Sequence, residues 1–310
     1  QSPQMRSLLQ AKNDVLQVLS TPDESMKATV PQVGPDSWWI YFTAIPLFDL
    51  ATGFLACFMF VFLVDFVFLK GKPGRWFGVH ALGNLIVSIA STPALLAWIN
   101  DPMTSMNVLK YPVSPVWHWN PLYVNNQWSA LMVPVIHTYH MVVFWQDLTP
   151  TDYFHHFVFV PYISGFGLMM RWGPLRNVLA WFICGVPGGL DYFFLFLMKR
   201  GLLDRLTQKR YMCFLNVWIR SPGLILTAAT LVSVWNYGEC PESFVPVMLL
   251  AAVIVFFNGQ YYAEMAVGNF HERLMETKFM KKFDIKKSNC PPPSMDTPRA
   301  FNPAAKERAL

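Results

Sequence analysis

The chain alternates between long apolar runs and shorter polar segments. Seven runs approach the 20 or so residues that an α-helix needs to cross the hydrocarbon core of a membrane. They cover residues 43–69, 76–99, 128–146, 154–170, 175–198, 211–235 and 244–264. The fourth is short and is bounded by Arg171. No run has the alternation of a β-barrel strand. The pattern therefore predicts an all-α, polytopic membrane bundle of about seven transmembrane helices.

The same pattern divides the chain into three parts. Residues 1–37 are a polar N-terminal tail with a short amphipathic helix, residues 38–265 are the transmembrane bundle, and residues 266–310 are a C-terminal tail, first basic and then proline-rich. Hydrophobic residues make up 54% of the chain and charged residues 14%, against about 25% charged in soluble proteins. Neither tail can build a core of its own, so we expect both to be ordered against other membrane protein subunits.

Lysine and arginine are distributed unevenly between the two sides of the predicted membrane. Six lie on the side of the N-terminal tail and seventeen on the side of the C-terminal tail, while Arg220 lies inside the sixth run. The positive-inside rule places the C-terminus on the cytosolic or matrix side of an endoplasmic reticulum or mitochondrial inner membrane, and the N-terminus outside. The net charge of +5 is thus explained by orientation and lipid contact, and we expect no nucleic-acid partner.

The residue inventory argues against several cofactor-dependent classes. The five cysteines have no CxxC spacing, which argues against a metal knuckle. A membrane di-iron oxidase needs about eight histidines in paired boxes, and this chain has seven. No facing histidine pair has the spacing of a haem cytochrome, and the last run lacks the lysine of a retinal protein. We therefore expect neither a metal nor a bound cofactor.

Ionisable residues inside the runs gather in the half of the membrane next to the basic side. Each costs several kcal/mol in lipid unless it is paired or hydrated. His140 and Asp191 lie about 9 and 10 Å from the inner ends of their runs, and Arg220 lies about 14 Å inside. This distribution predicts one hydrated polar pocket that opens inward.

The position of each remaining polar residue along the runs indicates whether it lies at the membrane interface, away from the pocket or at the mouth of the pocket. Asp65 and Glu264 are typical of helix ends that reach the interface, whereas Asp49 and His137 lie away from the expected pocket. The inner loop after the third run adds further polar residues to its mouth, which are Asp147, Asp152, His155 and His156.

Three segments together carry a family resemblance. They are KGKPGRWFGVHALGNLIVSIASTPALLAWINDP, FWQDLTPTDYFHHFVFV and GGLDYFFLFLMKRGLLDRLTQKRYMCFLNVWIR. In this order they resemble the TLC-domain family of polytopic membrane proteins, which includes ceramide synthases and lipid-regulating relatives, over about residues 70–257. The resemblance implies that His155 or His156 could act as a general base in acyl transfer from acyl-CoA, oriented by Asp152 or Asp191.

The chain departs from the ceramide synthase pattern after the histidine pair. The ceramide synthase pattern continues with a Ser-Tyr pair, an Asn and Arg, and a His-Asp-x-x-Asp cluster. Of these residues the chain offers only Asp191. The resemblance is therefore to the branch that lacks synthase activity. Two functions remain open. One is a lipid-binding accessory subunit of a larger membrane complex, and the other is an acyltransferase with acyl-CoA as co-substrate. We expect the first, with the lipid head group bound by His80, His140, Asp147 and Arg220.

Overall fold

The computed structural model describes residues 10, 47–103, 105, 123–148, 153, 156–157, 160, 164–165, 168, 172–236 and 245–282. All regular elements in these ranges are helical, which confirms the predicted helical class. Five helical segments of this part of the chain are long and apolar enough to cross a membrane: Phe48–Leu69, Arg75–Asn100, Leu175–Lys199, Arg205–Val234 and Val245–Met280. The predicted count of seven is not confirmed.

The first half of the described chain explains part of the difference between the seven expected spans and the five found. It contains α3 (Leu47–Val64), the π-helix η2 (Asp65–Leu69), α4 (Arg75–Asn100), α5 (Trp128–Val143) and the 3-10 helix η3 (Trp145–Asp147). The 16 residues of α5 span about 24 Å, less than the roughly 30 Å of a hydrocarbon core. The predicted fourth run, 154–170, lies mostly outside the described residues.

The second half consists of three long helical segments. The first joins α8 (Leu175–Ala180), the π-helix η6 (Trp181–Gly185) and α9 (Val186–Lys199), and the second joins α10 (Arg205–Leu215), the π-helix η7 (Asn216–Arg220) and α11 (Ser221–Asn236). The third is α12 (Val245–Lys282), which continues without interruption past position 265, where the sequence pattern places the end of the bundle. Its 38 residues span about 57 Å.

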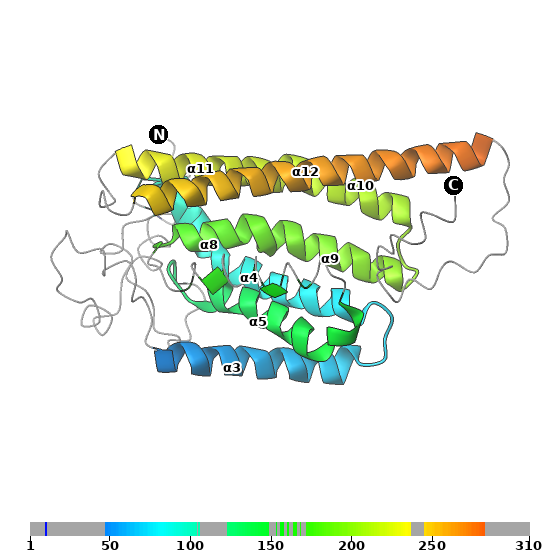
Figure 1. The fold of residues 1–310 in the computed structure, drawn as a ribbon, viewed down its shortest axis with the longest axis horizontal. Coiled ribbons are helices and arrows are strands. Elements are labelled where there is room, and N and C mark those ends of the chain that lie inside the picture. The colour runs from blue at the N-terminus through cyan, green and yellow to red at the C-terminus, as the bar shows by residue number, and fades with distance from the viewer. Residues whose placement is uncertain are drawn as a thin grey trace.

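Helix α4 is central in the bundle. It packs against α5, α8 and α9, while α3 packs against α5, and α11 and α10 pack against α12. Figure 1 shows α3 along one edge of the molecule and α10 to α12 along the opposite edge. The turns after α3 and α9, together with the end of α5, lie at the right-hand end of this view, which we call the basic end. Helix α12 extends beyond the other helices at the same end (Figure 1).

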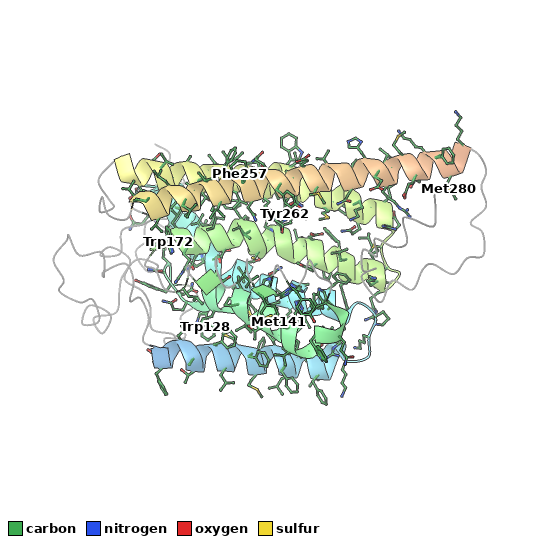
Figure 2. All side chains as sticks on the ribbon, viewed as in Figure 1. Trp128, Met141, Trp172, Phe257, Tyr262 and Met280 are labelled. Carbon is green, nitrogen blue, oxygen red and sulfur yellow. The ribbon has the colours of Figure 1, made fainter. Side chains whose placement is uncertain are left out.

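The outer surface of the bundle is apolar. Helix α3 exposes a row of large hydrophobic side chains along its length, namely Phe48, Leu55, Met59, Phe60, Phe62 and Leu63. Figure 2 shows such side chains projecting outward along α3, and Phe257 on α12 is also exposed. In water this surface would be unfavourable, whereas lipid tails solvate it without penalty. The surface supports the assignment as an integral membrane protein.

Two of the π-helices have a cause in the sequence. Pro187 and Pro222 each lie two residues after a π-helix, η6 and η7 respectively. Proline has no backbone N–H to donate to the carbonyl four residues earlier, so the helix widens instead of keeping its regular ladder. A widened turn changes the direction of neighbouring side chains and is frequent at functional sites. Here η7 ends at Arg220, a buried residue.

Candidate functional site

Four histidine side chains meet inside the basic half of the bundle. We call His80, His137, His140 and His156 the histidine cluster. The ring centroids of His80 and His140 are 3.8 Å apart, those of His137 and His156 are 5.3 Å apart, and those of His140 and His156 are 6.0 Å apart. His140 is fully buried, and His156 and His80 are 3% and 4% exposed. The cluster thus joins α4, α5 and the segment that carries the adjacent His155 and His156.

Aromatic rings enclose the histidine cluster. The ring of Trp76 stacks on His140 at 3.8 Å and 8°, and the ring of Tyr192 stacks on His80 at 4.1 Å and 8°. Phe144 packs edge-on against both Trp76 and His140. Such contacts fix the planes of the imidazoles and exclude lipid tails from them.

Hydrogen bonds to the backbone select tautomers for two of the histidines. The Nδ1 of His137 donates to the carbonyl of Val133 at 2.7 Å, and the Nδ1 of His80 donates to the carbonyl of Trp76 at 3.4 Å. With the proton on Nδ1, the Nε2 atom of each ring can accept a proton or a hydrogen bond. His140 differs, because neither of its buried nitrogens has a hydrogen-bond partner in the described part of the chain.

A buried ion pair anchors the cluster on one side. The Nε of Arg75 donates to the two carboxylate oxygens of Asp65 at 2.7 and 3.0 Å, and a terminal nitrogen of the same guanidinium donates to one of these oxygens. The hydroxyl of Tyr139 donates to the same carboxylate. Asp65 has no exposed surface. The sequence interpretation of Asp65 as an interface residue is therefore wrong, because the chain reverses through Gly71 and Gly74, both at positive φ, and returns Arg75 to it.

A second polar group lies around Arg220. We call Asp191, Gln208, Asn216, Arg220 and Tyr262 the arginine group. Arg220 is 8% exposed and donates to the side-chain oxygen of Asn216 at 2.7 Å, and Gln208 donates to Asp191 at 3.3 Å. The guanidinium lies 5.7 Å from the ring centroid of Tyr262. No direct ion pair joins Asp191 and Arg220, and no described residue accepts from the buried Nε of Arg220.

One face of α4 connects the two groups. Trp76, His80, Asn84 and Ser88 recur every four residues, so they share a helix face, and the last three are buried. A Cβ atom on Gly188 would lie 3.1 Å from the amide nitrogen of Asn84 and 3.5 Å from a terminal nitrogen of Arg220. Asn84 and the arginine group therefore meet at α9. Tyr192 adds a further link, because it stacks on His80 and directly follows Asp191 in α9.

The predicted site residues fall into three sets. His80, His140 and His156 meet in the histidine cluster, while Asp191 and Arg220 meet in the arginine group. Asp152, His155 and the side chain of Asp147 lie outside the described residues. Asp49 is in the first turn of α3, and Glu264 is exposed on α12.

Sequence reasoning missed two features of the interior. It set His137 apart, yet the ring of His137 is 6.0 Å from that of His80. The three-residue spacing of His137 and His140 carries the signal, because such positions share a helix face. It also counted Arg176 with the outer charges, whereas Arg176 is 8% exposed in the first turn of α8.

In comparisons with known proteins, no family model, no curated protein and no solved structure matches this chain.

Proposed function

We propose that this protein binds a membrane lipid whose polar head group enters the interior between the histidine cluster and the arginine group. The observation that carries the proposal is His140, which is fully buried and has two nitrogens without a hydrogen-bond partner among the residues that the structure describes. Buried polar atoms in proteins are nearly always hydrogen-bonded, so an unpartnered pair calls for a water or a ligand. A hydroxylated or phosphorylated head group supplies both donors and acceptors.

A lipid suits this interior better than a water-soluble ligand. The outer faces of α3 and α12 are apolar, and the polar groups lie inside the bundle that these faces enclose. A ligand that places its polar end inside and its tails outside matches both surfaces. The resemblance to the lipid-regulating branch of the TLC-domain family supports the same assignment.

The proposal includes a role as an accessory subunit of a membrane complex. Only about 20 residues of α12 are needed to cross a membrane, so its basic end extends into the aqueous phase on the C-terminal side, which we assign to the cytosol or matrix. There Met275 and Phe279, four residues apart on one face, are 63% and 56% exposed. An apolar surface outside the membrane is favourable when another protein covers it. Native gel electrophoresis after mild detergent extraction, with mass spectrometry of the co-migrating chains, tests this part.

Binding is tested on purified protein in lipid nanodiscs. We expect phospholipids to be retained through extraction and detected by native mass spectrometry. Changing both His80 and His140 to alanine should reduce the retained lipid by about tenfold, equivalent to 1.4 kcal/mol. His271→Ala is the matched control, because His271 is exposed on α12. Retention that is equal in the double variant and the control contradicts the proposal.

An acyltransferase is the second candidate, and the position of His156 favours it. His156 lies beside His137, whose Nε2 is left as the proton acceptor by the hydrogen bond to Val133. In such a reaction a lipid hydroxyl or amine attacks the acyl-CoA thioester, the imidazole takes the proton of the nucleophile, and the CoA thiolate leaves and is protonated. Incubation with radiolabelled acyl-CoA should then yield an acylated lipid, and His156→Ala should abolish it. Lipid retention without acylated product in the wild type supports binding alone.

A further inference from the structure

A third polar cluster lies at the end of the bundle opposite the histidine cluster. We call Asn126, Gln127, Ser129, Arg176 and Asn177 the outer cluster, and all five are buried. Asn177 donates to the carbonyls of Val124 and Asn126 at 3.1 Å each, and Ser129 donates to Asn177 at 2.6 Å. Asn126 donates to the carbonyl of Ala90 at 2.6 Å. These bonds tie α4, α5 and α8 together.

Arg176 brings a positive charge into the outer cluster that no acidic group of the described residues balances. It is 8% exposed, and one terminal nitrogen donates to the carbonyl of Asn126 at 3.2 Å. Among the described residues, its buried Nε has no partner and no carboxylate lies within ion-pair distance. A buried guanidinium without a counter-ion is strongly unfavourable, and a backbone carbonyl does not neutralise it.

Gln127 gives an independent observation one residue from the carbonyl that Arg176 contacts. It follows Asn126, whose carbonyl accepts from Arg176, and it is 1% exposed. Within the described part of the chain, neither its amide nitrogen nor its amide oxygen has a hydrogen-bond partner. The cluster therefore offers one uncompensated cation and at least two unused N–H donors, in Arg176 and Gln127. This is the donor set that an oxyanion requires.

We propose that Arg176 and Gln127 bind an oxyanion, a carboxylate or a phosphate, at the outer end of the bundle. The site is separate from the histidine cluster and adds a second ligand to the protein. The guanidinium contributes the charge and a directed N–H, and the amide nitrogen of Gln127 donates to another oxygen of the anion. The anion is either a free small ion or the acidic head group of a lipid in the outer leaflet, since both present the same oxygens.

The experiment uses the full chain in nanodiscs and follows thermal unfolding. The wild type and Arg176→Met are compared in phosphatidylcholine discs as inorganic phosphate is added, and in discs that also contain phosphatidylglycerol. Arg210→Met is the matched control, because Arg210 is exposed near the basic end. For a free anion, phosphate should raise the unfolding temperature of the wild type and of the control, and about tenfold more phosphate should be needed for Arg176→Met.

For a lipid head group, phosphate has no effect, whereas phosphatidylglycerol raises the unfolding temperature of the wild type and not that of Arg176→Met. If Arg176→Met does not fold, Gln127→Leu replaces it, since this variant keeps the cation and removes a donor. The proposal is overturned if neither phosphate nor phosphatidylglycerol stabilises the wild type. It is also overturned if either one stabilises the wild type and the Arg176 or Gln127 variant equally.

Discussion

Replacing Arg75 by methionine should destabilise the protein strongly, because it leaves the carboxylate of Asp65 buried without a counter-ion. Asp65 has no exposed surface, whereas Arg75 is 28% exposed and Tyr139 is fully buried. Breaking a buried ion pair by removing one partner costs about 3–5 kcal/mol. The hydroxyl of Tyr139 remains as a donor to the carboxylate and keeps the loss from being larger. Tyr139→Phe removes the hydrogen bond to the carboxylate and leaves the ion pair in place, so we expect a cost of about 1.5–3 kcal/mol.

The assay is reversible unfolding in bicelles with increasing denaturant, with the free energy of unfolding compared between variants. Arg273→Met is the matched control, since Arg273 and Glu276 form an ion pair at 35% and 51% exposure, and surface pairs contribute about 0–1 kcal/mol. The double variant Asp65→Leu with Arg75→Met should recover much of the loss, because no buried charge is left. The reasoning is refuted if Arg75→Met costs no more than Arg273→Met.

Three further predictions concern packing, a helix cap and a buried hydrogen bond. A Cβ on Gly83 would clash with Ile136, and one on Gly223 would clash with the ring of Phe182. Changing either glycine to alanine should therefore lower the free energy of unfolding by about 1–3 kcal/mol in the same assay. Gly268→Ala is the control, because its Cβ meets open space and should not destabilise the protein. Asp204→Ala should speed hydrogen exchange in the first turn of α10, where the carboxylate accepts from the amide of Thr207 at 2.9 Å. Hydrogen bonds from Thr207 lower the pKa of Asp204, so the carboxylate should cap α10 at neutral pH. In the wild type the same fast exchange should appear only as the pH falls below about 4, where this carboxylate becomes protonated. Thr230→Val leaves the buried N–H of Trp98 without its acceptor at 3.0 Å and should cost about 1–3 kcal/mol, whereas Thr277→Val on the projecting part of α12 should cost less.

Hydropathy predicted the apolar parts of the long helices better than where these helices end. A lipid interior requires apolar helices, so runs such as 76–99 correspond closely to α4. At the end of α12 the hydropathy falls while the helix continues to Lys282. Polar residues such as Glu272 and Lys278 are good helix formers in water, so the end of an apolar run marks an exit from lipid rather than a helix end.

Some of the interior polar residues were predictable because they are unusual in lipid. His80 and His140 were expected in one pocket, and their rings are 3.8 Å apart. The ion pair of Asp65 and Arg75 was not foreseen, because hydropathy gives the depth of a residue but not the direction of its side chain. The turn through Gly71 and Gly74 decides that direction.

The outer cluster could not be read from the sequence for a related reason. Gln127 and Asn177 are neutral amides, common in loops, and neither has a charge that marks it as costly in a membrane. Their burial follows from packing between α4, α5 and α8, which joins residues far apart in the chain. Pairing of this kind depends on tertiary structure and leaves no local pattern.

The sign of a stability change can report whether the unpartnered polar groups hold ligands. A buried polar group in an empty cavity opposes folding, so replacing it by an apolar side chain of similar size is neutral or stabilising. The same group bound to a ligand favours folding, since binding to the native state adds stability. His140→Leu and Arg176→Met remove groups at opposite ends of the bundle, each with an unpartnered buried nitrogen. We expect both variants to be less stable than the wild type in native membrane extracts, by about 1–3 kcal/mol, and to lose this difference after delipidation and dialysis against anion-poor buffer. Equal or higher stability of a variant in the native extract means that its site is empty there, and because the two residues lie in separate clusters, each variant tests its own site.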